Sequence, residues 1–111
     1  MKIKYNTKSC KILSVGYLGY LKGFDMLIDI AAEVLRDYPQ WTWDIYGEGK
    51  ERENLERKIK TLSLEDKVFF KGYRKDMYRL YSQYSFFVLT WRAEGMGMVL
   101  VEAQKSGLPI V

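Results

Sequence analysis

Histidine is absent from this sequence of 111 residues, and cysteine occurs once, at Cys10. Without an imidazole the chain cannot build a His-based acid/base pair, a Ser-His-Asp triad or a histidine metal site, and one thiol forms neither an internal disulfide nor a thiolate cluster. No apolar run approaches the roughly 18 residues of a membrane span, and the N-terminal stretch lacks the apolar core of a signal peptide. A free thiol and no export signal favour a cytoplasmic protein.

The length allows one compact domain at most, because domains average about 150 residues. Hydrophobic residues at 48% and charged residues at 29% are ordinary globular proportions and exclude a disordered, collagen-like or coiled-coil chain. The whole net charge of +4 comes from the first 11 residues, where four lysines face no acid. The remaining 14 basic residues are matched by 14 acidic ones, so we expect no nucleic-acid partner.

Strand-like apolar runs alternate with helical patterns along the chain. Strands are expected at residues 11–15, 41–46, 68–70, 85–89 and 108–111, and helices at residues 24–38, 51–62, 77–84 and 97–105. Four β-α units followed by a strand predict an α/β fold with a doubly wound parallel sheet in the order 3-2-1-4-5. Ligands of such sheets bind where the strand order reverses, here between the loops at residues 16–23 and 90–97.

Two carboxylates, Glu94 and Glu102, lie eight residues apart at the start of the last expected helix. Gly95 and Gly97 allow a ligand to approach the free N–H groups of that helix start, which suits a phosphate or diphosphate. Because like charges repel, the carboxylates suit sugar hydroxyls instead, so the pattern indicates a nucleotide-sugar. The spacing alone favours the simpler interpretation, a helix start at which Glu94 interacts with the dipole and Glu102 is incidental.

The other candidate ligand-binding residues of the sequence are weaker evidence for a site. Lys22, in the loop at residues 16–23, would face the same crevice and could neutralise a diphosphate. The glycines at residues 16–23 and 95–97 form neither a G-x-G-x-x-G nor a Walker motif, which disfavours a dinucleotide or P-loop site. The Gly47-Glu48-Gly49 segment after a strand is interpreted as a tight turn.

Five motifs occur in order along these units: VGYLGYLKGFD at residues 15–25, IYGEG at 45–49, VFFKGY at 68–73, EGMGMVLVEA at 94–103 and SGLPIV at 106–111. Together they closely resemble the C-terminal, nucleotide-sugar-binding domain of GT-B glycosyltransferases of family 4. The resemblance runs from about residue 11 to the end. It implies a Rossmann-like donor-binding domain at residues 11–111, incomplete at its C-terminal end, behind a basic tail or linker at residues 1–10.

The resemblance also implies an activity. Such enzymes, which act in polysaccharide biosynthesis, transfer a sugar with retention and without a catalytic metal or other cofactor, from a nucleoside-diphosphate sugar (UDP- or GDP-sugar) to a glycan or glycolipid acceptor. The acceptor would bind an N-terminal domain that this sequence lacks, so the isolated piece is expected to be inactive. The implied location is the cytoplasm, with the inner face of the membrane as an alternative.

The resemblance assigns roles to individual residues. Glu94 would lie near the donor sugar, Lys22 would stabilise charge on the leaving diphosphate, and Glu102 would hold the ribose hydroxyls. The expected catalytic residues are thus Glu94 and Lys22. The expected donor-binding residues are Gly16, Tyr17, Gly47, Gly49, Tyr73, Arg92, Gly95, Met96, Gly97, Met98 and Glu102, and no metal ligand is expected.

One departure from the family pattern matters. The family usually carries an arginine after the first glycine, where this sequence has Tyr17, which supplies no positive charge. Arg92 is long enough to replace that charge if its loop turns inward. A non-catalytic relative that binds a protein partner therefore remains an alternative, and a generic nucleotide-binding domain is a more distant one.

Overall fold

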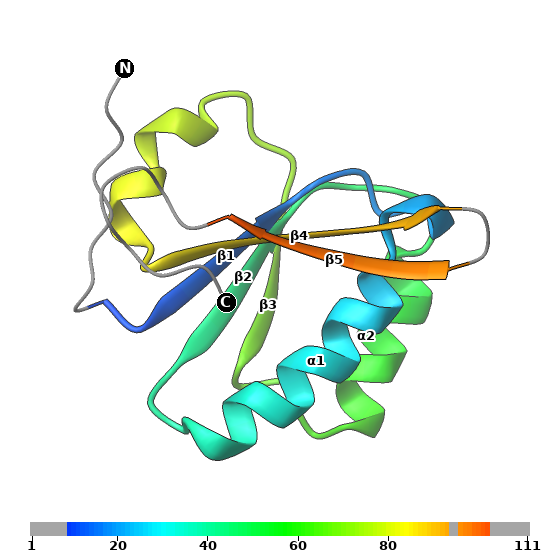
Figure 1. Ribbon diagram of the computed structural model, residues 1–111, viewed down its shortest axis with the longest axis horizontal. Coiled ribbons are helices and arrows are strands. Elements are labelled where there is room, and N and C mark those ends of the chain that lie inside the picture. The colour runs from blue at the N-terminus through cyan, green and yellow to red at the C-terminus, as the bar shows by residue number, and fades with distance from the viewer. Residues whose placement is uncertain (1–8, 94–95, 103–111) are drawn as a thin grey trace.

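A computed structural model describes residues 9–93 and 96–102 of the chain (Figure 1). In these residues a five-stranded sheet has the order β3-β2-β1-β4-β5. Neighbours among the first four strands pair in parallel, and the last pairs antiparallel with β4. This confirms the expected α/β sheet and its order through the first four strands. The strands are β1 (Lys11–Val15), β2 (Thr42–Tyr46), β3 (Val68–Gly72), β4 (Phe86–Ala93) and β5 (Met96–Glu102).

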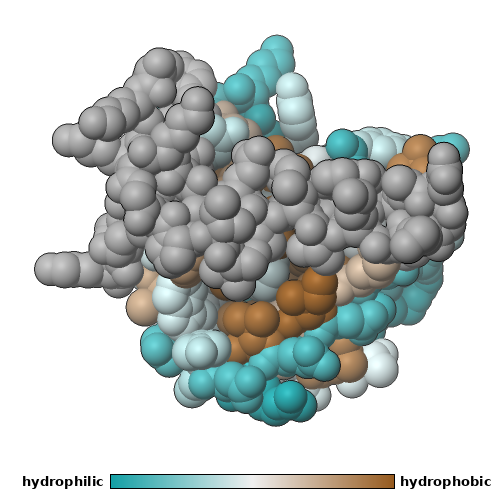
Figure 2. Space-filling model, in the orientation of Figure 1, coloured by the Kyte–Doolittle hydropathy of each residue, from teal (hydrophilic) through white to brown (hydrophobic). Residues whose placement is uncertain are grey.

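Two helices, α1 (Phe24–Asp37) and α2 (Arg52–Thr61), cover one face of the sheet (Figure 1). Each helix has an apolar stripe at helical spacing, as the sequence predicts. α1 ends at Asp37, because Pro39 disfavours a helical backbone at the preceding residue, Tyr38. Hydrophilic residues lie along the lower edge of the molecule in Figure 2, where the helices are. The buried core on this face includes Ile12, Leu27, Ile28, Ala31, Trp43, Ile45, Leu55, Ile59, Val68 and Val88.

The opposite face is covered by two short 3-10 turns, η2 (Met77–Arg79) and η3 (Tyr81–Gln83). The expected short helix at residues 77–84 is therefore wrong as an α-helix. Its apolar residues recur mostly three apart, which suits the three residues per turn of a 3-10 segment, and the backbone bonds run from Leu80 N to Met77 O and from Tyr84 N to Tyr81 O. A second buried cluster lies on this face and contains Met77, Leu80 and Tyr84 with two strand residues, Leu13 and Tyr46.

The expected helix over residues 97–105 is wrong as far as the structure describes it, because residues 96–102 form β5. Residues 98–101 are Met, Val, Leu and Val, which favour a strand as readily as the apolar face of a helix. β4 extends to Ala93, beyond the expected end at Leu89, and its edge offers backbone groups that β5 satisfies. The strand expected at residues 108–111 lies outside the described residues.

Buried polar side chains tie the strands together. The indole Nε1 of Trp43 donates to Ser14 Oγ at 2.9 Å, and Ser14 Oγ donates to the carbonyl of Val88 at 2.7 Å, so one hydroxyl links β1, β2 and β4. On the other face the Tyr84 hydroxyl donates to Asp44 Oδ2 at 2.6 Å. Burial, together with this hydrogen bond, raises the pKa of Tyr84 well above its ordinary value, so Tyr84 remains a donor at physiological pH.

Replacing Ser14 with alanine should lower the free energy of unfolding by about 1–3 kcal/mol, because the Trp43 N–H loses its buried acceptor. Urea denaturation of the wild type and the variant measures this. Ser82→Ala, at an exposed serine, is the matched control and should change the free energy by less than about 0.5 kcal/mol. Equal midpoints for Ser14→Ala and the wild type would show that the Ser14 bridge does not stabilise the sheet.

Candidate functional site

A cleft of about 530 Å³ opens at the carboxyl ends of β1, β2 and β3. This is the edge of an open α/β sheet where ligands bind. The cleft lies on the β2 and β3 side of β1, whereas the strand order alone favours the gap between β1 and β4. Its lining consists of Val15, Gly16, Tyr17, Tyr46, Gly47, Glu48, Gly49, Tyr73 and Arg74.

The loop after β1 and the turn after β2 meet backbone to backbone at this cleft. Gly47 has a φ of +150°, and a Cβ there would lie 1.8 Å from the carbonyl oxygen of Gly16. A Cβ on Gly49 would lie 2.4 Å from the carbonyl oxygen of Leu18. Hydrogen bonds from Leu18 N to Glu48 O and from Glu51 N to Leu18 O hold the two segments together. Close packing therefore accounts for both glycines, whereas the backbone turn lies at residues 49–52, where Arg52 N donates to Gly49 O, and not at residues 47–49 as the sequence suggests.

Three tyrosines are among the residues that line the cleft. Tyr17 and Tyr73 are 55% and 70% exposed, and Tyr46 is buried at the end of β2. Lys22 ends η1 (Tyr20–Lys22), and a Cβ on Gly16 would lie 3.7 Å from Lys22 Cδ. The structure thus places the stem of Lys22 against the loop that borders the cleft.

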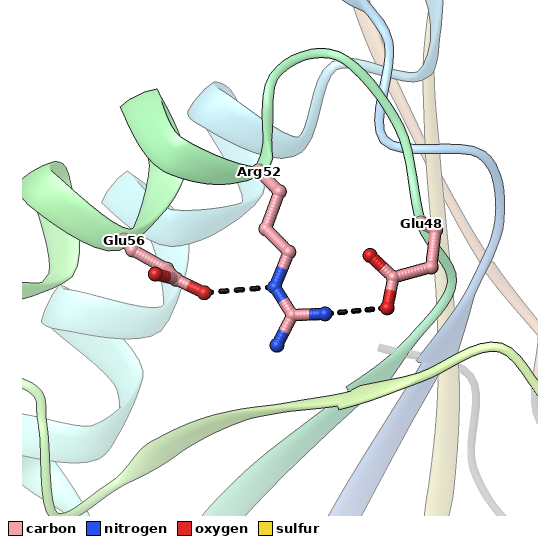
Figure 3. A network of polar contacts seen from close by, with 3 residues as sticks. All are labelled: Glu48, Arg52 and Glu56. Carbon is pink, nitrogen blue, oxygen red and sulfur yellow. Dashed lines mark hydrogen bonds and ion pairs between the residues drawn. The ribbon is translucent and has the colours of Figure 1, made fainter.

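One rim of the cleft carries a carboxylate held by an arginine (Figure 3). Arg52 Nη1 donates to Glu48 Oε2 at 2.5 Å, and Arg52 Nε donates to Glu56 Oε1 at 2.8 Å. These two hydrogen bonds, that to Glu56 first, raise the pKa of Arg52 above its ordinary value. The same guanidinium lies 5.9 Å from the ring centroid of Phe70, which limits where it can move.

The segment after β3 carries the opposite charge. Arg74 lines the cleft, and its Nε and Nη2 donate to the two carboxylate oxygens of Asp76 at 2.5 and 3.2 Å. This hydrogen bonding lowers the pKa of Asp76 and raises that of Arg74. The lining of the cleft therefore contains one negative group, Glu48, and one positive group, Arg74, each in an ion pair.

Five of the predicted site residues meet in the cleft: Gly16, Tyr17, Gly47, Gly49 and Tyr73. Gly97 and Glu102 are not brought together, because they pair with Arg92 near the end of β4 and with Phe87 near its start. Residues 96–102 form a strand and not a helix start, so the free N–H groups that were expected to bind a diphosphate are not present there. The predicted residues Glu94 and Gly95 lie outside the described residues, as do the side chains of Arg92, Met96, Met98 and Glu102.

Four lining residues are absent from the set predicted by the sequence: Val15, Tyr46, Glu48 and Arg74. Tyr46 ends β2, Glu48 follows it, and Arg74 follows β3. The available signal is position, since the carboxyl ends of neighbouring parallel strands share one edge. In the sequence pattern Glu48 stands out only as part of a turn between two glycines.

Two further properties concern the described residues alone. Residues 9–93 and 96–102 contain no group of three or more His, Cys, Asp or Glu side chains placed to hold a metal ion. No helix in this part of the chain has the length and apolar character needed to cross a bilayer.

Known proteins resemble most of the chain. The sequence profile of the family "Glycosyl transferases group 1" matches residues 2–111. An uncharacterized glycosyltransferase of Haemophilus influenzae is 41% identical over 100 residues, which cover 90% of this chain and 28% of that protein. The UDP-N-acetylglucosamine–peptide N-acetylglucosaminyltransferase GtfA subunit of Streptococcus gordonii is 31% identical over 104 residues, covering 94% of this chain and 20% of that subunit.

A solved structure has the same fold. It is the pneumococcal O-GlcNAc transferase GtfA in complex with UDP and GlcNAc, with a TM-score of 0.75 and 27% identity. The match covers 86% of this chain and 19% of that one. The chain thus spans less than a third of each of these relatives.

Gly47→Ala should lower the free energy of unfolding by about 3–5 kcal/mol, since the added methyl overlaps the Gly16 carbonyl and the positive φ is strained. Urea denaturation provides the measurement. Gly16→Ala is the control, because its nearest neighbour would be the Phe24 ring at 3.5 Å, an ordinary contact, and it should cost less than about 1 kcal/mol. Similar losses in the two variants would contradict the backbone contact.

Proposed function

Because the chain belongs to the glycosyl transferases group 1 family, we propose that it forms the donor-binding part of an enzyme that transfers a sugar from a nucleoside-diphosphate sugar to a glycan or glycolipid acceptor. The observation that carries this proposal is the cleft at the carboxyl ends of β1–β3, which is lined by tyrosines and glycines. The pneumococcal relative, whose solved structure is a complex with UDP and GlcNAc, supports a donor of this class.

The cleft suits the nucleoside end of such a donor. Tyrosine rings offer flat surfaces for a base, and a concave site with few polar groups is typical of small-molecule binding. The remaining diphosphate and sugar would extend along the loop that carries Lys22. The acceptor would bind residues outside this sequence, in a domain that precedes this one in the full-length protein.

The proposed reaction retains the configuration of the sugar and uses no metal. As a phosphate–sugar bond breaks, negative charge develops on the departing nucleoside diphosphate, and a lysine ammonium nearby stabilises that charge. We assign this role to Lys22. The roles of Glu94 near the donor sugar and of Glu102 at the ribose stay predictions, as does compensation by Arg92 for the arginine that Tyr17 replaces.

The alternative function is a non-catalytic, partner-binding relative. Tyr17 favours it, because a phenol hydroxyl supplies one hydrogen bond but no charge to a leaving diphosphate. The two functions differ in a measurable way. An enzyme turns over a nucleotide-sugar, whereas a binding module does not.

In the full-length protein, Lys22→Ala should lower kcat for release of UDP or GDP from the matching nucleotide-sugar by about a hundredfold or more. The physical reason is the loss of a charge-assisted contact to the leaving diphosphate, worth about 2–4 kcal/mol. Coupled detection of released nucleoside diphosphate, with a panel of UDP- and GDP-sugars, provides the measurement.

Lys60→Ala, at an exposed lysine of α2, is the control and should leave kcat unchanged. An unchanged kcat in Lys22→Ala would remove Lys22 from the reaction. If the wild type turns over no UDP- or GDP-sugar although it binds one, the partner-binding alternative is the better account.

A further inference from the structure

Two charged residues of the cleft, Glu48 and Arg74, have no part in the function proposed so far. Both line the cleft together with the tyrosines. The Glu48 side chain is 52% exposed and the Arg74 side chain 45% exposed, so both can meet a ligand. A role for them rests on the proposed function and concerns how the same cleft recognises the base of the donor.

Glu48 is held in a defined position. Arg52 is the only group in the described part of the chain that bonds its carboxylate, and it does so at Oε2 alone. The carboxylate also lies against the backbone of β3, since a Cβ on Gly72 would be 3.2 Å from Glu48 Oε2. A carboxylate has about four acceptor positions, so Oε1 keeps its capacity to accept hydrogen bonds.

Arg52 is itself fixed from its other side. Its Nε donates to Glu56, and its guanidinium rests near the Phe70 ring, so the arginine spans the gap between α2 and the turn after β2 (Figure 3). A planar guanidinium bonded at two nitrogens is more rigid than a lysine ammonium. This contact therefore fixes the direction in which Glu48 points.

The ligand chemistry follows from these groups. A base stacked on a tyrosine ring presents its edge to polar side chains, and in uracil and guanine that edge carries a ring N–H beside a carbonyl oxygen. A carboxylate accepts the N–H, and a guanidinium donates to the carbonyl. Arg74, whose guanidinium is held by Asp76, supplies the second of these groups in the same cleft.

We propose that Glu48 is the specificity-determining residue that accepts the ring N–H of the donor's base, and that Arg52 is the positioning residue that orients it. The base is a uracil or a guanine, whose carbonyl edge receives Arg74. An adenine has no ring N–H at this edge and is disfavoured.

The test compares the binding of two ligands to the wild type and to Glu48→Ala, measured by calorimetry on the full-length protein. UDP is compared with N3-methyl-UDP, in which a methyl group replaces the hydrogen on N3. If the protein binds GDP instead, GDP is compared with N1-methyl-GDP. The wild type should bind the methylated ligand at least about tenfold more weakly, because a hydrogen bond to a charged group is lost. Glu48→Ala should bind the two ligands within about threefold of each other.

Glu53→Ala, which removes the same charge from an exposed position on α2, is the matched control and should keep the tenfold discrimination. Arg52→Gln should raise the KM for the nucleotide-sugar with little change in kcat, the reverse of Lys22→Ala, and Arg52→Lys should recover part of the loss. A purely structural Arg52 would instead lower the amount of folded protein and leave KM unchanged.

The wild-type comparison needs no variant to fold. If the wild type binds UDP and N3-methyl-UDP equally, or if Glu48→Ala keeps the discrimination, the inference is overturned while the proposed function stands. If neither UDP nor GDP binds to the full-length protein, both the proposed function and this inference are overturned.

Discussion

The close contact between the loop after β1 and the turn after β2 is the constraint on which the candidate site depends. Gly47 and Gly49 let this turn approach the backbone of Gly16 and Leu18 more closely than any side chain would permit. The approach makes Tyr17 and Glu48 line one cleft, although they lie on separate β-α units. Backbone packing therefore shapes the site before any charged group acts in it.

Charge is then positioned by partners outside the cleft. Arg52 bonds Glu48 and Asp76 bonds Arg74, so each of these two cleft residues is in an ion pair. About half of each side chain remains exposed to a ligand. Exposed ion pairs of this kind contribute little to stability, commonly about 0–1 kcal/mol. Their consequence for function is larger, because a side chain held in one orientation loses less conformational freedom when a ligand binds.

Local patterns are sufficient to predict α1, α2 and the four parallel strands. The stripe of Phe24, Leu27 and Leu35 has only one compatible periodicity, and Pro39 limits where that helix can end. Residues 97–102 are ambiguous, since an aliphatic run serves a helix face or a strand equally well, and pairing with the edge of β4 decides the outcome. That decision depends on tertiary contacts, which periodicity does not record.

The site is predictable in part for the same reason. Glycines and Tyr73 stand out as motif residues, and the structure brings them together. The relation between Glu48 and Arg52 is not visible as a motif, because Glu48 lies in the loop before α2 and exposed charged pairs of this kind usually carry no function. Only the position of Glu48 in the cleft distinguishes this pair from other surface pairs.

The most direct test of the account is a crystal structure of the full-length protein with bound UDP. The account predicts that the uracil ring lies in the cleft against Tyr17 or Tyr73, with N3 within hydrogen-bond distance of Glu48, about 2.7–3.2 Å. The diphosphate should run along the loop that carries Lys22. A uracil bound elsewhere on the domain, with the cleft at residues 46–49 and 73–74 left to solvent, would contradict it.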